Sequence, residues 1–163
     1  MKRYYGLLWI CALCSCGIYT FSGSTLPSHL KTVDIPLFVN ASLQANVAEE
    51  ITDSLSKRVL ATNLMRIVPT GGDATISGRV VTYANTPRFY GNAGLRQVTI
   101  SEYEVDITVE VEFADNKKNV PLYKGSITGK GVYDFAKESE DIGRRKAESD
   151  IVDQVLQNSL QSW

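Results

Sequence analysis

The sequence predicts an α+β fold, a two-layer α/β sandwich with two amphipathic helices on one face of a mainly antiparallel four-stranded sheet. Strict alternation of apolar and polar residues over 103–113 predicts a half-buried strand. Apolar residues that recur with helical spacing over 43–62 and again over 137–160 predict the two helices. With 163 residues, 44% hydrophobic and 21% charged, the chain has the size and composition of one globular domain. The expected order is β-α-β-β-β-α, with a possible extra short strand at 64–68.

Residues 1–15 are predicted to be a lipoprotein signal peptide. Lys2 and Arg3 supply a short positive segment, and residues 4–13 form an uncharged, mostly apolar stretch. A transmembrane helix needs about 20 apolar residues, so this shorter stretch indicates a secretory signal. An N-terminal signal anchor with incidental cysteines is the alternative.

A lipidated cysteine is predicted at position 16. The sequence Leu13-Cys14-Ser15-Cys16 resembles the bacterial lipobox, in which an aliphatic and two small residues precede the cysteine that receives the lipid. The three cysteines stand at 11, 14 and 16, so cleavage before Cys16 leaves the mature domain without a free thiol or a disulfide. Residues 16–30 are expected to form a lipidated tether, because their Gly, Ser and Pro content discourages regular structure. Residues 31–163 are then a single periplasmic α/β domain.

The first half of the domain is expected to form a strand and a helix. Residues 32–39 alternate as a half-buried strand does, and Pro36 favours an edge position or a bulge because it lacks an N–H. A helix is expected from Leu43 to Thr62, capped by Asn40 or Ser42. Its apolar residues recur every four positions and indicate a helix lying on a core.

The second half is expected to be a meander followed by a helix. A strand over 74–83 precedes a loop over 85–96, where glycine, proline and asparagine break the periodicity. The strand over 103–113 has one apolar and one acidic face, which favours an antiparallel sheet covered on one side. The chain is expected to turn at 115–119 and to return as a strand over 122–135, and residues 137–160 are expected to be helical.

Charge and packing suggest how the last two strands pair. The predicted register is Glu110 with Lys124, Glu104 with Lys130, Val109 with Gly125, Val105 with Gly129 and Tyr103 with Gly131. It sets opposite charges across from each other and bulky residues across from glycines, and both arrangements favour pairing.

No enzyme chemistry is predicted. The formal net charge of −1 provides no basic surface for nucleic acid. The single histidine, His29, lies in the tether and is expected to be a surface residue without an acidic partner. The carboxylates at 102, 104, 110 and 112 share one strand face and indicate a salt-bridged ladder, not a glycosidase pair or a calcium loop. No metal site or cofactor is expected, and a periplasmic hydrolase would need a polar pocket with a strongly perturbed pKa.

Two clusters of basic residues are candidate binding groups. The 85–96 loop offers Arg88 and Arg96 beside Phe89 and Tyr90, and the planar fork of arginine suits phosphate and carboxylate. The alternative is an ordinary surface loop. The run of basic residues at 144–146 lies near acidic residues and is expected to be a helix surface with local ion pairs.

The chain resembles the LptE-type lipopolysaccharide-assembly lipoproteins over nearly its whole length. Four segments carry the resemblance in order. They are Cys16-Gly17-Ile18-Tyr19-Thr20-Phe21-Ser22-Gly23 after the lipobox, Lys31–Phe38 before the first helix, Gly72–Arg79, and the closing Asp150–Leu156.

The resemblance implies a lipid-anchored protein on the periplasmic face of the outer membrane. Such a protein sits as a plug in a large outer-membrane β-barrel, assists its assembly, and binds lipopolysaccharide before delivery to the cell surface. In relatives, basic residues on exposed loops contact the glycolipid phosphates. Arg88 and Arg96 match them best by position, and Lys117 and Lys118 come second. The alternative function is a lipid-anchored structural or pilot protein of another outer-membrane complex.

Overall fold

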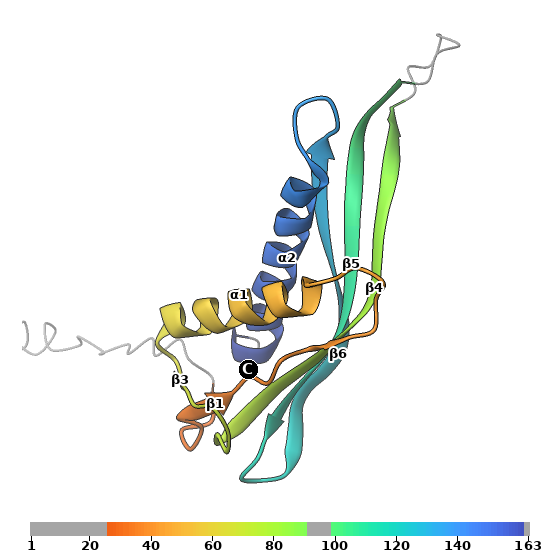
Figure 1. Ribbon diagram of the computed structural model, residues 1–163. Helices are drawn as coiled ribbons and strands as arrows, with labels where there is room; N and C mark the ends of the chain where they lie inside the picture. Colours follow the sequence, from red (N-terminus) through yellow and green to blue (C-terminus); the bar gives the residue numbers. More distant parts are fainter. Residues whose placement is uncertain (1–25, 91–98, 162–163) are drawn as a thin grey trace, which may run out of the picture.

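The computed structural model describes residues 26–90 and 99–161, and these form two helices on one side of a six-stranded sheet (Figure 1). The α+β class is therefore confirmed. The strand order is β3-β1-β4-β5-β6, with β2 also paired to β4. The sheet is mixed, not four-stranded as expected, because β1, β2 and β3 pair in parallel beside the antiparallel β4–β6. The strands are β1 Thr32–Asp34, β2 Val39–Asn40, β3 Arg66–Ile67, β4 Ala74–Tyr90, β5 Thr99–Asp115 and β6 Val120–Asp134.

The expected continuous strand over 32–39 is two short strands. β1 pairs with β4 at Ala74, and β2 pairs with it again at Arg79. Pro36 lies between them and cannot donate a ladder hydrogen bond, so the chain leaves the sheet there. The side chain of Phe38 is buried over Gly78, where an added Cβ would overlap its ring. The glycine therefore lets this segment lie flat on β4.

Helix α1 spans Val47–Thr62 and begins four residues later than expected. Asn46 precedes it in the left-handed region, at φ 65°, and neither Asn40 nor Ser42 caps the helix. Instead, the Asn40 side-chain oxygen accepts hydrogen bonds from the Ser42 N–H (3.0 Å) and hydroxyl (2.7 Å), which closes a local turn. The predicted apolar face is confirmed, since Val47, Ile51, Leu55 and Val59 are all buried.

Strands β4 and β5 form a ladder that is longer than the periodicity indicated. Residues 85–90, expected to lie in a loop, continue β4, with Asn85 opposite Val105 and Arg88 opposite Glu102. Pro87 is tolerated because β4 has no other strand beside it at that level among the described residues. The loop prediction is therefore wrong for 85–90.

The predicted β5–β6 register is wrong by two residues. Glu112 lies opposite Lys124, and Val105 lies opposite Gly131. The turn closes between Asp115 and Val120, and an irregularity after Phe113 shifts the pairing by one more residue. Because side chains alternate with a period of two, every residue stays on its predicted face. The ion pair of Lys130 with Glu104 (3.0 Å) forms across a diagonal instead.

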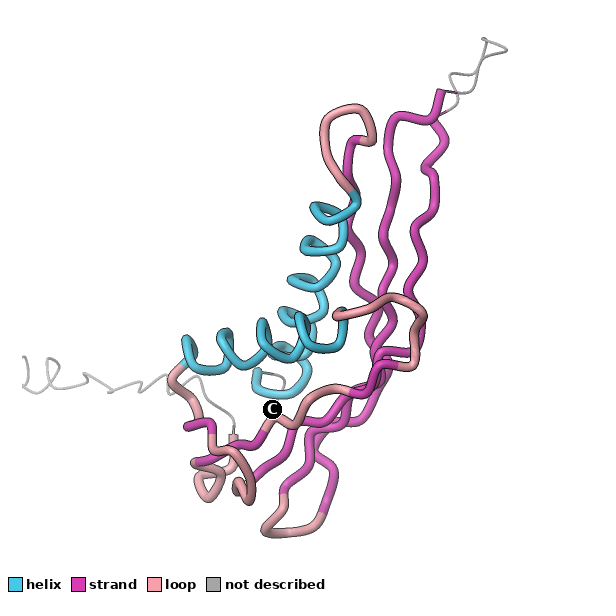
Figure 2. Tube along the Cα trace, in the orientation of Figure 1, coloured by secondary structure: helices cyan, strands magenta, loops and turns pink. Residues whose placement is uncertain are grey.

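Helix α2 spans Glu140–Leu156, continues as a π-helical segment over Gln157–Gln161, and packs directly on β5 and β6. Gly129 and Gly131 of β6 face the α2 backbone, and a Cβ at either position would overlap a carbonyl oxygen of the helix. Helix α1 crosses α2 instead of running along the strands (Figures 1 and 2). The core between the layers includes Ile76, Val80, Val105, Ile107, Val109, Phe113, Ile151, Val152 and Val155.

Candidate functional site

Arg88 lies near the end of β4 on the polar face of the sheet. Its side chain is 43% exposed, and its Nη1 lies 3.6 Å from Glu104 Oε2 and 4.0 Å from Glu102 Oε2. Lys130 of β6 contacts the same row, 3.0 Å from Glu104 and 3.2 Å from Asp106. These two carboxylates raise the pKa of Lys130. The predicted salt-bridged acidic ladder is therefore present at this end of the sheet.

The opposite face of the same end is aromatic. Tyr103 stacks on Tyr133 with ring centroids 5.8 Å apart, and Phe135 lies 5.2 Å from Tyr103. Phe135 is 65% exposed, and the Asn85 side-chain amide donates to the Tyr133 hydroxyl at 3.0 Å. This end of the sheet therefore presents ion-paired charge on one face and aromatic surface on the other.

Lys117 and Lys118 lie at the other end of the sheet, in the β5–β6 turn. The Lys117 ammonium is 2.7 Å from Asp73 Oδ1 and donates to the His29 carbonyl at 3.1 Å. The Lys117 ammonium, followed by the backbone N–H of Lys31, holds the pKa of Asp73 well below its usual range. Lys118 donates only its backbone N–H to Asp115 (3.0 Å), and its side chain is exposed.

The structure does not bring the predicted ligand residues together. Arg88 lies 14 residues along β4 from Ala74, the partner of Asp115 next to the turn. At about 3.3 Å per residue, the two ends are about 45 Å apart along the strand. Arg96 and Cys16 lie outside the described residues.

The expectation that His29 has no acidic partner is wrong. His29 Nε2 lies 2.6 Å from Oδ2 of Asp115, whose side chain is fully buried although the two residues are 86 positions apart. Burial alone would raise the pKa of Asp115, but hydrogen bonds from His29 and from the backbone N–H of Lys118 and Lys117 hold it below its ordinary value. The pair fastens the segment before β1 to the β5–β6 turn.

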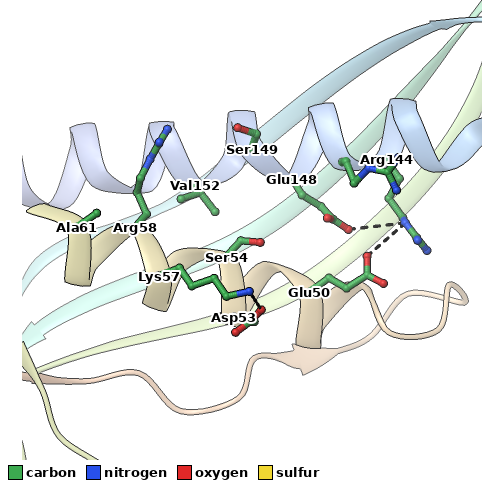
Figure 3. A pocket seen from close by; sticks show the side chains of 11 residues that line it. Glu50, Asp53, Ser54, Lys57, Arg58, Ala61, Arg144, Glu148, Ser149 and Val152 are labelled. Atoms are coloured by element: carbon green, nitrogen blue, oxygen red, sulfur yellow. Dashed lines mark ion pairs between the residues drawn. The ribbon is translucent and has the colours of Figure 1, made fainter.

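A groove of about 680 Å³ runs between the two helices (Figure 3). In it, Arg144 Nε lies 3.4 Å from Glu50 of α1 and 3.8 Å from Glu148 one turn along α2. Glu148 is only 4% exposed, and burial, followed by the neighbouring Glu50, raises its pKa to about 8. The predicted local ion pairs of 144–146 are present, but Arg144 is only 17% exposed and joins the two helices. Residues of the groove are Glu50, Asp53, Ser54, Lys57, Arg58, Ala61, Arg144, Arg145, Glu148, Ser149 and Val152.

Glu148 is a buried residue that sequence reasoning missed. It lies three, four and seven positions before Ile151, Val152 and Val155, on the apolar face of α2. A carboxyl group at such a position must be neutral or paired, so the helical spacing itself was the available signal.

Two further properties bear on the class of protein. Over residues 26–90 and 99–161, no group of histidine, cysteine or acidic side chains is arranged to hold a metal ion. In the same part of the chain, neither helix has the length and apolar character needed to cross a membrane.

Comparison with solved structures shows that the fold recurs in bacterial proteins of very different sequence. A hypothetical protein from Chlamydia trachomatis is similar with a TM-score of 0.53 and 10% identity, over 80% of this chain and 98% of that one. The PelC dodecamer from Paraburkholderia phytofirmans is similar with a TM-score of 0.51 and 14% identity, over 82% and 92%. A minor lipoprotein from Acinetobacter baumannii is similar with a TM-score of 0.50 and 14% identity, over 80% and 93%. At these identities the likeness concerns the fold alone.

Sequence comparison identifies the family. No curated protein matches the chain. The family model described as LptE, lipopolysaccharide-assembly, matches residues 30–159, which run from two residues before β1 into the π-helical segment after α2. This family consists of non-enzymatic lipoproteins. Because the match covers most of the chain, this protein belongs to the LptE family of lipopolysaccharide-assembly proteins.

Proposed function

We propose that this protein is an outer-membrane lipoprotein that plugs and helps to assemble the lipopolysaccharide-translocating β-barrel, and that it binds lipopolysaccharide during delivery. The observation that carries the proposal is the family match, which spans both helices and all six strands. The described domain is compatible with a plug, since its two layers leave one sheet face polar and ion-paired.

The barrel partnership is tested by purification from native membranes. A chain tagged after its C-terminus should recover a large outer-membrane β-barrel when the membranes are dissolved in mild detergent. Recovery of no barrel would contradict the proposal. Recovery of a different outer-membrane complex would favour the alternative, a structural or pilot lipoprotein.

The glycolipid is proposed to meet the protein at Arg88 and Arg96, with Lys118 and Lys117 as secondary contacts. The Arg88 guanidinium is nearly half exposed, and its ion pairs with Glu102 and Glu104 are long. Exposed ion pairs of this kind contribute only about 0–1 kcal/mol, so a phosphate group can compete for the guanidinium. The exposed ring of Phe135 lies on the opposite face of the same end and is available to acyl chains. Lys117 is the weaker of the lysines because its ammonium already binds Asp73.

Charge reversal at both arginines tests this contact. Arg88→Glu combined with Arg96→Glu is expected to weaken lipopolysaccharide binding by tenfold or more, since each lost charged hydrogen bond is worth roughly 1.5–3 kcal/mol. Binding is measured with labelled lipopolysaccharide and the purified chain in detergent. The control is Arg66→Glu, an exposed arginine on β3, which should bind as the unaltered chain does. Equal affinity of the double variant and the control would remove these arginines from the site.

The anchor is proposed to be the lipid on Cys16, after removal of residues 1–15. Each buried CH₂ contributes about 0.8 kcal/mol, and more than one chain is needed for stable anchoring. Gly17 replaces the aspartate that retains many such lipoproteins in the inner membrane, which favours transport outward.

Substitution of the cysteine tests the anchor. Cys16→Ser is expected to accumulate as uncleaved precursor at the inner membrane, because the thiol that receives the lipid is missing. Mass spectrometry of the N-terminus and membrane fractionation measure this. Cys14→Ser, which alters a residue removed with the signal peptide, should be processed normally. A Cys16→Ser protein that matures and reaches the outer membrane would refute lipidation.

A further inference from the structure

The two long edges of the sheet differ in how far other segments cover them. β6 forms one edge along its whole length. On the other side, β1 and β2 pair with β4 only as far as Val80. Beyond that residue, β5 is the only strand paired with β4 in the part of the chain that the structure describes. In Figures 1 and 2 this upper part of β4 extends past the connection from β2 to α1.

The β6 edge is covered by side chains from Thr128 to Asp134. Four outward-facing backbone groups, on alternate residues of β6, are hydrogen-bonded by side chains of α2 and of the loop before it. The bonds run from Gln154 to the Thr128 carbonyl (3.2 Å), from the Lys130 N–H to Asp150 (3.1 Å), from Lys146 to the Val132 carbonyl (2.9 Å) and from the Asp134 N–H to Glu138 (3.1 Å). Along Thr128–Asp134, another strand would have to displace these side chains before it could pair with β6.

The β4 edge has no such cover. In an antiparallel ladder, alternate residues turn both backbone groups to the same neighbour. The Ala41 N–H donates to the Val80 carbonyl at 2.9 Å, so the backbone N–H and C=O of Val80 point away from β5. The irregularity between Val80 and Thr82 shifts this alternation by one residue. The backbone groups of Tyr83, Asn85 and Pro87 therefore point outward, away from β5. Among the described residues, no side chain bonds the outward backbone groups of Tyr83 and Asn85 as α2 bonds those of β6.

The surface beside this edge is shaped for a short strand. A hollow of about 270 Å³, formed by residues 41–44 of the connection and 81–83 of β4, lies where the edge begins. Leu43 lines it with a fully exposed side chain, which offers an apolar contact. Pro87 has no N–H and ends the row of donors after Asn85. The open edge therefore extends from Thr82 to Pro87.

The side chains along the edge indicate the chemistry of an added strand. On the polar face, Thr82, Ala84 and Thr86 are small and exposed, so an added strand there would lie near the charged row of β5. That row has three carboxylates, Glu102, Glu104 and Asp106, and each of them contacts Arg88 or Lys130. Long basic side chains from the next strand can approach this acidic row. On the other face, the half-buried Tyr83 and Pro87 suit apolar neighbours.

We propose that the β4 edge from Thr82 to Pro87 docks an extended segment of a partner protein, which adds to the sheet as a further strand and alternates basic with apolar side chains. Main-chain hydrogen bonds to Tyr83 and Asn85 supply the affinity, and the Leu43 hollow and the acidic row supply the selectivity.

The test uses the full chain in detergent and a capped, monomeric peptide of alternating lysine and valine. Saturating peptide should slow hydrogen exchange at the Tyr83 and Asn85 amides about tenfold, as expected when an exposed N–H becomes bonded. Asn85→Pro removes the outward N–H and should weaken binding about tenfold, the effect of one or two lost hydrogen bonds. Asn85→Ala, which loses the bond to Tyr133 but keeps the N–H, should bind normally.

Two modified peptides make the result independent of any variant's folding. A peptide N-methylated at alternate residues should not bind, and one of alternating glutamate and valine should bind about tenfold more weakly because of the acidic row. Equal binding of all three peptides, or protection on β6 instead of β4, would overturn the proposal. A dimer of the chain that Asn85→Pro abolishes would show that a second copy is the occupant, which also overturns it. Neither glycolipid nor barrel is present, so the outcome does not depend on the proposed function.

Discussion

Gly131→Ala is expected to destabilise the domain by about 3 kcal/mol, the upper part of the usual range for overpacking a core. A Cβ on Gly131 would overlap the carbonyl oxygen of Gly143 and lie 2.8 Å from the backbone nitrogen of Ala147. Both atoms belong to the α2 backbone, so no side-chain rotation can relieve the clash. The helix would have to move away from β6, and the buried contacts of its apolar face would be lost.

Denaturant unfolding measures this effect, and β6 provides its own control. Gly125 lies on the same strand, but an added Cβ there meets the Tyr123 hydroxyl at 2.6 Å, at the far end of a side chain that can rotate. Gly125→Ala should therefore cost less than 1 kcal/mol, as substitutions with room to relax usually do. If the two variants are equally stable, α2 does not lie directly on β6.

Glu148→Gln is expected to remove a strong pH dependence of stability. The folded protein raises the pKa of Glu148 from 4.5 to about 8 through burial and the neighbouring Glu50. Between those pH values the native state keeps a proton that the unfolded state has released. The stabilising contribution is therefore complete below pH 4.5 and is lost as pH rises to 8, at no more than about 1.4 kcal/mol per pH unit. Glutamine has nearly the same shape and does not ionise.

The expected result is that the two stability curves converge as the pH falls. At pH 8 the Glu148→Gln variant should be more stable than the unaltered chain by up to about 4 kcal/mol, and the difference should shrink towards pH 5. Unfolding free energies measured across this range provide the test. Glu49→Gln, at an exposed position on α1, should leave the profile unchanged. A Glu148→Gln profile parallel to that of the unaltered chain would mean that the native proton resides elsewhere.

Sequence periodicity predicts the elements whose side-chain pattern does not depend on neighbouring segments. The alternation over 103–113 identifies β5 and its two faces because a strand's side chains alternate whatever its neighbours are. The extension of β4 through Pro87 could not be predicted in this way, since its support is the pairing with Tyr103 and Glu102 on another strand. The register error has the same origin, because a shift of two residues preserves every face and only the turn geometry distinguishes the alternatives.

Some residues of the candidate site could be predicted from the sequence, but their contacts with distant segments could not. Arg88 could be selected from its residue type and neighbours, but its ion pairs with β5 depend on β4 being a strand at that point. The contact of His29 with Asp115 joins residues 86 positions apart, and no pattern within either segment indicates it. The burial of Glu148 could be predicted, since its helical spacing from Ile151 and Val155 placed a carboxyl group among core residues.

The contact between His29 and Asp115 determines how the domain responds to a force applied at its N-terminal end. Strand β1 has only three residues and would peel easily if pulled directly. A pull on the preceding chain instead reaches His29 first, and its bond to Asp115 carries the load into the 17-residue β5. That strand is paired on both sides, so it resists by shear along many hydrogen bonds at once. A domain pulled from this end therefore keeps β1 out of the path of the force.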